Sequence, residues 1–111
     1  MFDTEDFLAK LKEIPGTWKL ASFAGRPDFI RHETGLCPLR VLAQHRSGTS
    51  PSTWLACGRA LGFAFEDSRI VVLAADNSAA TFMPGFITKT ELAQANALRQ
   101  RMIEVLHPEE V

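Results

Sequence analysis

Apolar positions three or four residues apart predict a short amphipathic helix near the start of the sequence. Asp3 stands where an N-cap belongs, and Pro15-Gly16 ends the pattern. The buried face of this helix would carry Phe7, Leu8, Leu11 and Ile14.

After Thr17 the apolar pattern changes to alternation, which is typical of strands. Trp18, Leu20 and Ser22 alternate with Lys19, Ala21 and Phe23. Residues 24–28 supply turn formers before Phe29-Ile30-Arg31, so the segment predicts a small β-hairpin. Because a two-stranded ribbon is marginal in water, we expect Trp18, Leu20 and Ile30 to pack on helices.

Proline and glycine mark the next two predicted helices. Cys37 is a candidate N-cap with Pro38 at the first helical position, and Gly48 suits the C-terminal end of a helix over 38–47. Ser50-Pro51 predicts the start of a third helix that ends at Gly62. Its expected apolar residues are Trp54, Leu55, Cys57 and Leu61.

The most apolar stretch of the chain predicts a fourth, central helix. Glu66 and Asp67 favour its N-terminal end, where the helix dipole is positive. Its expected core residues are Ile70, Val71, Leu73 and Ala74. The loop over 76–86 that follows is long and unusually apolar.

The last predicted helix begins at a capping box. Thr88 and Glu91 have the spacing of that motif, and Ile87 and Leu92 have the spacing of a hydrophobic staple. We expect the helix to run to about Leu106 before His107-Pro108. The predicted buried stripe is Leu92, Ala95, Leu98, Met102 and either Val105 or Leu106.

These elements predict a mainly α fold with minor β, in which about five short helices accompany a small hairpin after the first. At 111 residues and 46% hydrophobic content, the chain fits one globular domain over 1–111. Twelve basic and thirteen acidic residues leave a formal charge of -1, so no strong net field attracts nucleic acid or anionic membrane.

Charge and cysteine usage predict a cytoplasmic protein that has no membrane contact. Acidic and basic residues interrupt positions 1–20, which therefore lack the apolar core of a signal peptide. Two cysteines, Cys37 and Cys57, are too few for a disulfide framework, so we expect free thiols.

Metal and catalytic sites find little support in the sequence, and we expect no cofactor. Cys37 and His45 lie eight residues apart on one predicted helix, about 12 Å along its axis, which is too far for a shared ion. A site from His32, Cys37 and Cys57 stays open geometrically. Cys37 at a helix N-terminus, with His32 or Arg40 nearby, is the remaining hypothesis for a cysteine-dependent enzyme.

Nucleic-acid binding is a further hypothesis, because the third and fourth helices around Gly62 have helix-turn-helix-like spacing. However, the fourth helix offers only Arg69 for reading base edges. The candidate anion or nucleic-acid patch consists of Arg31, Arg40, Arg46, Arg99 and Arg101.

The apolar loop is the best candidate for recognition of a protein partner. Phe82, Met83 and Phe86 would form an anchor if they face water, and a lid if they fold over the core. The hairpin tip, from Phe23 to Phe29, is a second candidate surface. Without a catalytic signature, we expect a non-enzymatic accessory, regulatory or inhibitory factor that binds another protein.

Three short segments also carry a resemblance. They are Cys37-Pro38-Leu39, Leu61-Gly62 and Ala74-Ala75-Asp76-Asn77. Following a hairpin, this combination is similar to small bacterial and phage proteins. The resemblance implies no activity and suggests a bacterial or phage origin.

Overall fold

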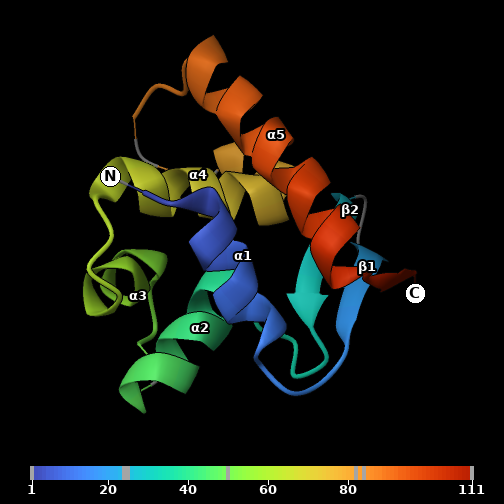
Figure 1. Ribbon diagram of the computed structural model, residues 1–111. Coiled ribbons are helices and arrows are strands. Elements are labelled where there is room, and N and C mark those ends of the chain that lie inside the picture. The colour runs from blue at the N-terminus through green and yellow to red at the C-terminus, as the bar shows by residue number, and fades with distance from the viewer. Residues whose placement is uncertain (1, 24–25, 50, 82, 84, 111) are drawn as a thin grey trace.

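The computed structural model describes the chain except for residues 1, 24–25, 50, 82, 84 and 111. Its described residues form five α-helices, one short 3-10 helix and a small sheet, which confirms the predicted mainly α class (Figure 1). The elements are α1 (Thr4–Lys12), β1 (Trp18–Phe23), β2 (Arg26–His32), α2 (Pro38–Ser47), α3 (Trp54–Ala60), α4 (Phe65–Ala75), η1 (Asn77–Thr81), α5 (Lys89–Leu106) and β3 (Glu109–Glu110).

Local capping chemistry sets the start of α1 and both ends of α2, as predicted, whereas α1 ends at Lys12 and not at Pro15-Gly16, so that the buried Ile14 lies after the helix. The Asp3 carboxylate accepts a hydrogen bond of 3.0 Å from the Asp6 amide at the start of α1. Cys37 is the N-cap residue of α2, with Pro38 directly after it. Gly48 ends α2 with φ +73°, a left-handed conformation that glycine adopts without a side-chain clash.

Helix α3 begins later than predicted. Its N-cap is Thr53, whose hydroxyl accepts a 3.1 Å hydrogen bond from the Ala56 amide. Ser50 lies outside the described residues, and Pro51 precedes the helix without belonging to it. The prediction of a start at Ser50-Pro51 was wrong because three nearby hydroxyl residues compete for one capping position, and Thr53 holds it.

The hairpin belongs to a three-stranded sheet in the order β2-β1-β3. Leu20 pairs with Ile30 across the antiparallel β1 and β2 strands. Residues 26–28, predicted as turn, are part of β2, and the edge position of that strand tolerates Pro27 because its outer side needs no amide donor. The unpredicted β3 pairs in parallel with β1 and adds a 2.7 Å ion pair between Lys19 Nζ and Glu109 Oε2.

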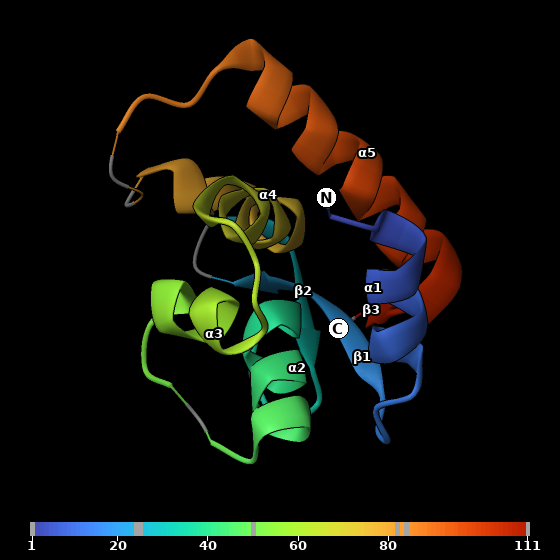
Figure 2. The ribbon, with the colours of Figure 1, turned by 60° about the vertical axis from the view of Figure 1, so that its left-hand side comes forward.

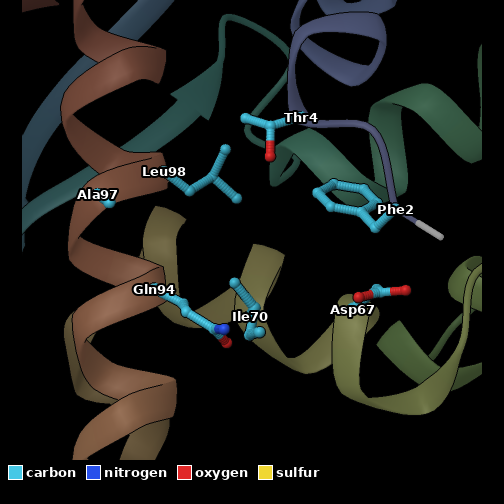
Figure 3. Close-up of a pocket in the computed structure, with 7 residues that line it drawn as sticks. All are labelled: Phe2, Thr4, Asp67, Ile70, Gln94, Ala97 and Leu98. Carbon is cyan, nitrogen blue, oxygen red and sulfur yellow. The ribbon is translucent and has the colours of Figure 1, made fainter.

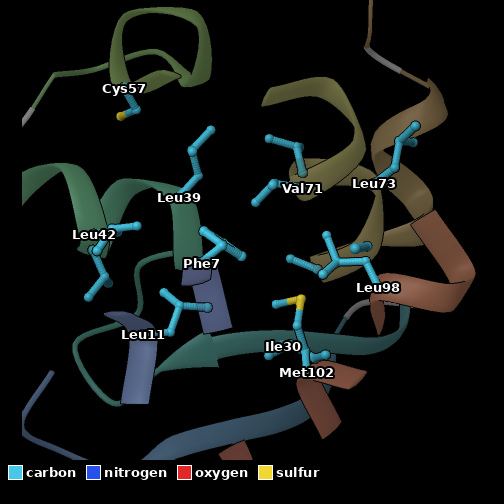
Figure 4. Close-up of a cluster of buried hydrophobic side chains, with 14 of the residues drawn as sticks. Phe7, Leu11, Ile30, Leu39, Leu42, Cys57, Val71, Leu73, Leu98 and Met102 are labelled. Carbon is cyan, nitrogen blue, oxygen red and sulfur yellow. The ribbon is translucent and has the colours of Figure 1, made fainter. Parts of the chain in front are cut away.

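Helix α4 occupies the centre of the fold, as predicted. It packs against α2, α3, α5 and β2, and Figure 2 shows these elements around it. Every residue from 71 to 76 is buried. The core that forms around α4 is shown in Figure 4, where Phe7, Leu11, Ile30, Leu39, Leu42, Cys57, Val71, Leu73, Leu98 and Met102 are labelled.

The segment between α4 and α5 is more ordered than a simple loop. Asp76 Oδ1 accepts hydrogen bonds from the Ser78 amide at 3.0 Å and the Ser78 hydroxyl at 2.6 Å, which starts η1. The predicted capping box at Thr88 and Glu91 then opens α5. Ala95, Leu98 and Met102 are buried along α5 as expected, but Leu92 is 40% exposed, because it lies to one side of the face that meets α4.

Candidate functional site

A buried arginine on α4 organises the surface at the N-terminal ends of α4 and α5. Arg69 is only 5% exposed. Its Nη2 donates a 2.6 Å hydrogen bond to the carbonyl oxygen of Phe86, and its Nε lies 2.8 Å from Glu91 Oε2. Its guanidinium carbon lies 5.9 Å from the centre of the Phe65 ring, within cation–π range. One side chain therefore holds α4, α5 and the Phe86 backbone together.

Local sequence brings the partners of Arg69 into reach. Phe65 precedes it by four residues, which places both on one side of α4. Glu91 is fixed by the capping box, since its amide donates to the Thr88 hydroxyl and its carboxylate accepts from the Thr88 amide. Sequence reasoning missed this arrangement because Glu91 lies 22 positions from Arg69 and no local pattern joins them.

Three large apolar side chains of the described residues are exposed, and two of these residues contact Arg69. They are Phe65 at 45%, Phe86 at 84% and Leu92 at 40% exposure. Two of them contact Arg69 through ring or backbone, and Leu92 directly follows its ion-pair partner Glu91. We call these three residues the Phe86 surface. Trp54 extends it from α3, because its ring lies 5.7 Å from that of Phe65.

The structure divides the three residues that the sequence predicted as a partner anchor. Phe86 is the most exposed of the large apolar residues described. Met83 is only 6% exposed and belongs to the hydrophobic core, so it is buried rather than available to a partner. Phe82 lies outside the described residues. The loop is thus lid-like at Met83 and open to solvent at Phe86.

Two of the five predicted patch arginines serve the fold itself. Arg99 is buried, and its Nη1 donates to the carbonyl oxygens of Ala74 at 2.9 Å and Ala75 at 3.2 Å, the last residues of α4. Arg101 pairs at 2.6 Å with both Glu5 and Glu104. Arg99 is therefore not available at the surface, and the charge of Arg101 is balanced by the carboxylates of Glu5 and Glu104.

The other three patch arginines lie on β2 and α2. Arg31 is half-buried on β2, whereas Arg46 is exposed in the last turn of α2. Arg40 lies in the first turn of α2, half-buried beside the two cysteines in a pocket. The five arginines therefore divide between ion pairing, helix capping and separate surface positions.

Helix α4 is covered by other elements, which bears on the helix-turn-helix hypothesis. Its residues from Val71 to Ala75 are buried, and α2, α3 and α5 all pack on it. Arg69, its only basic residue, is held by Glu91 and Phe86. A reading helix must present polar side chains to a DNA groove, and α4 presents none of its basic groups.

Burial raises the pKa of both cysteine thiols, which keeps them protonated at neutral pH. For Cys37, burial outweighs the opposing effects of the Arg40 and Leu39 amides and of the Arg40 charge on the pKa. For Cys57, burial is again the main cause of the raised pKa, with the nearby Cys37 adding to it. Neither thiol has the depressed pKa that activates a cysteine nucleophile.

The histidine of the open metal hypothesis is engaged elsewhere. His32 Nε2 lies 2.9 Å from the carbonyl oxygen of Pro15, and Nδ1 lies 3.0 Å from the Thr34 hydroxyl. A carbonyl only accepts, so Nε2 carries the proton and Nδ1 accepts from Thr34. Within the part of the chain that is described, no three His, Cys, Asp or Glu side chains are placed to hold a metal ion.

Another pocket, distinct from the one beside Arg40, lies between α4, α5 and the segment before α1. It has a volume of about 340 Å³. Figure 3 shows Phe2, Ile70 and Leu98 as its apolar side chains, with the polar ends of Thr4, Asp67 and Gln94 around it. Its mixed lining is typical of a shallow surface depression and offers no nucleophile paired with a base.

Comparisons with known proteins add no functional information. The chain matches no protein-family model, no curated protein and no solved structure. In the described residues, no helix combines the length and apolar character needed to cross a membrane.

Proposed function

We propose that the chain is a non-enzymatic accessory or regulatory factor that acts by binding another protein through the Phe86 surface. The observation that carries the proposal is the 84% exposure of Phe86 on a backbone that the buried Arg69 holds in place. Burying a phenylalanine side chain contributes about 1.5–3 kcal/mol, which is the scale of an interface hot spot.

Pre-organisation favours Phe86 as the anchor of such a contact. Its carbonyl oxygen is fixed by Arg69, and the capping box at Thr88 and Glu91 fixes the chain two residues later. An anchor that is already ordered loses little entropy on binding. Phe65, whose ring packs on the same Arg69 side chain, and Leu92 on α5 are further exposed apolar residues for a partner to cover.

The charged residues near Phe86 indicate what kind of partner this surface fits. The charge of Arg69 is balanced by Glu91, whereas the exposed Glu66 next to Phe65 makes no ion pair with any described residue. The partner is therefore a protein with an apolar pocket for Phe86 and a basic residue at the rim of that pocket. Rim charges of this kind mainly increase the association rate and selectivity.

Site-specific crosslinking tests the proposal. Phe86 is replaced by the photoreactive analogue p-benzoylphenylalanine, and the exposed His45 on α2 receives the same analogue as a control. We expect one discrete adduct with a different protein from position 86 and none from position 45. Excess unlabelled wild-type chain should compete this adduct away, whereas the Phe86→Ser chain should not.

Three results would contradict the proposal. One is an adduct of two copies of this chain, which would make the surface a self-association site. Another is equal crosslinking from positions 86 and 45. The third is equal competition by Phe86→Ser, provided that its melting temperature matches the wild type, as the exposure of Phe86 predicts.

A further inference from the structure

A pocket of about 240 Å³ lies where α2, α3 and the C-terminal end of α4 meet. Figure 2 shows these three helices next to one another, and each packs against the other two. Ser52 and Thr53, which are exposed, line the pocket at the surface. Cys57 and Ala75, each only 1% exposed, line it on the inside. The pocket therefore leads from the surface toward the core.

One side chain joins this pocket to the Phe86 surface. Trp54 lines the pocket from the first turn of α3, and its ring lies 5.7 Å from that of Phe65. Phe65 in turn contacts Arg69, whose Nη2 donates to the Phe86 carbonyl oxygen. An interface of ordinary size buries about 800 Å² on each protein, so a partner that covers Phe86 and Phe65 also reaches the opening beside Trp54.

The lining of the pocket favours an uncharged, apolar occupant. Phe29, Trp54 and Val72 are among its apolar residues. Arg40 and Asp76 line it as well, so a charged group of either sign would meet a charge of its own sign besides losing its hydration. The Arg40 Nε is buried and therefore offers no donor at the pocket wall. An apolar side chain avoids both costs.

We propose that the partner protein inserts one apolar side chain, of about the size of leucine or phenylalanine, into this pocket while its own pocket receives Phe86. This inference rests on the proposed function and adds that the contact is reciprocal, with one anchor from each protein. The volume is sufficient, because an apolar cavity of about 150 Å³ holds benzene. Paired anchors of this kind are typical of protein interfaces.

Side-chain analogues test the pocket without the partner. Toluene represents phenylalanine, n-butylamine represents lysine and propionate represents glutamate. In the ¹⁵N-labelled chain we expect toluene to shift the indole N–H signal of Trp54 in a saturable way. The two charged analogues should bind at least about tenfold more weakly, because each would lose its hydration in the pocket. The Trp54→Phe variant identifies the signal, since Trp18 is the only other tryptophan.

The crosslink from position 86 shows whether the partner uses the pocket. Ser52→Trp places a bulky side chain at the opening, whereas Gln100→Trp places the same side chain at an exposed site on α5 that does not line the pocket. We expect Ser52→Trp to lose the toluene shift and to compete for the position-86 adduct at least about tenfold less well than the wild type. Gln100→Trp should compete like the wild type.

The outcomes for the pocket and for the Phe86 surface are distinguishable. No saturable shift with toluene, or an equal response to either charged analogue, would overturn the pocket proposal. Full competition by a folded Ser52→Trp chain that no longer binds toluene would overturn it as well. If Ser52→Trp still binds toluene, Val72→Phe, which enlarges a side chain of the pocket wall, takes its place in the competition. Absence of any adduct from position 86 would contradict the proposed function, and this inference with it, even where toluene binds.

Discussion

Single arginines in this protein differ in role according to what surrounds them. Arg69 joins two helices and fixes the Phe86 backbone, Arg99 caps the end of α4, and Arg101 makes partly exposed ion pairs. Arg40 alone of the four has a buried nitrogen without a hydrogen bond or ion pair among the described residues. The sequence shows eight arginines but not which of them are buried, since that depends on residues distant in the chain.

The first prediction concerns the stability that Arg69 provides. Replacing it in Arg69→Gln leaves the Glu91 carboxylate without its cation and the Phe86 carbonyl without its donor. We expect the free energy of unfolding to fall by about 2–4 kcal/mol, because one partner of a largely buried ion pair is removed. Urea denaturation measures this loss, and hydrogen exchange should show faster opening at Phe86.

Arg101→Gln is the matched control for that prediction. It removes the same charge from ion pairs in which the arginine side chain is 43% exposed, so we expect little change in the free energy of unfolding. Equal destabilisation by the two substitutions would show that burial of Arg69 is not the cause.

The second prediction follows from the raised pKa of Cys37 and Cys57. At neutral pH both thiols are protonated in the folded and unfolded chain, so their stabilising contribution is fully present. Above about pH 9 the unfolded chain ionises first, and stability falls as the pH rises toward the folded pKa values. The chain contains no tyrosine, so phenol ionisation does not contribute.

Thermal unfolding between neutral and alkaline pH measures this effect. We expect the alkaline decrease in melting temperature to be smaller in the Cys37→Ala, Cys57→Ala double variant, which has no thiols to ionise. An identical decrease in the double variant and the wild type would contradict the prediction.

Secondary-structure elements were predictable where one short segment sets their ends. Asp3, Gly48 and the capping box at Thr88 define helix ends through contacts within four residues. The parallel pairing of β3 with β1 was not predictable, because it joins distant segments. The η1 turn could have been found from the spacing of Asp76 and Ser78, which suits an Asx turn.

The candidate site was only partly predictable for the same reason. Phe86 stood out as an aromatic residue in an apolar loop, and it is exposed. Met83 in the same loop is buried, and nothing in the local sequence distinguishes the two. Arg69 was identified as the only base-reading candidate on α4, but its ion pair with Glu91 depends on tertiary packing.

The third prediction concerns the contact between α3 and α4. A Cβ atom built on the buried Gly58 would lie 2.8 Å from Ser68 Cβ and would also overlap the Ser68 hydroxyl. We therefore expect Gly58→Ala to lower the free energy of unfolding by about 1–3 kcal/mol through overpacking. Chemical denaturation provides the measurement.

Removing the opposing side chain should relieve the overlap at Gly58. The double variant Gly58→Ala, Ser68→Gly is expected to be more stable than the sum of the two single effects indicates. If the effects of the two single substitutions on the free energy of unfolding simply add up in the double variant, Gly58 is required for a reason other than its close approach to Ser68.

At the scale of the whole molecule, we expect contact with protein rather than with nucleic acid, because few basic groups are available to phosphates. The formal charge is -1, and two of the five candidate patch arginines are used within the fold. Three large apolar residues of the described chain are exposed, and two of them, Phe65 and Phe86, contact Arg69. The molecule therefore combines a small net charge with exposed apolar residues at the Phe86 surface.

The fourth prediction tests whether the chain binds nucleic acid. In a gel-shift experiment at low salt, we expect the chain to leave a short DNA duplex or a single-stranded RNA unshifted, because too few basic groups are available to displace counterions from phosphates. A shift that weakens steeply with salt, and that is lost in an Arg31→Gln, Arg46→Gln variant, would favour the nucleic-acid alternative.

The ion pairs between the two ends of the described chain also affect the order of events during synthesis on the ribosome. Glu5 and Arg101 are 96 positions apart, and Lys19 and Glu109 are 90 positions apart. Neither contact can form until α5 and the segment that follows it have emerged from the exit tunnel. The side of α1 that packs on α5 and the edge of β1 that pairs with β3 therefore stay uncovered until those segments emerge, and holdase chaperones can bind there in the meantime.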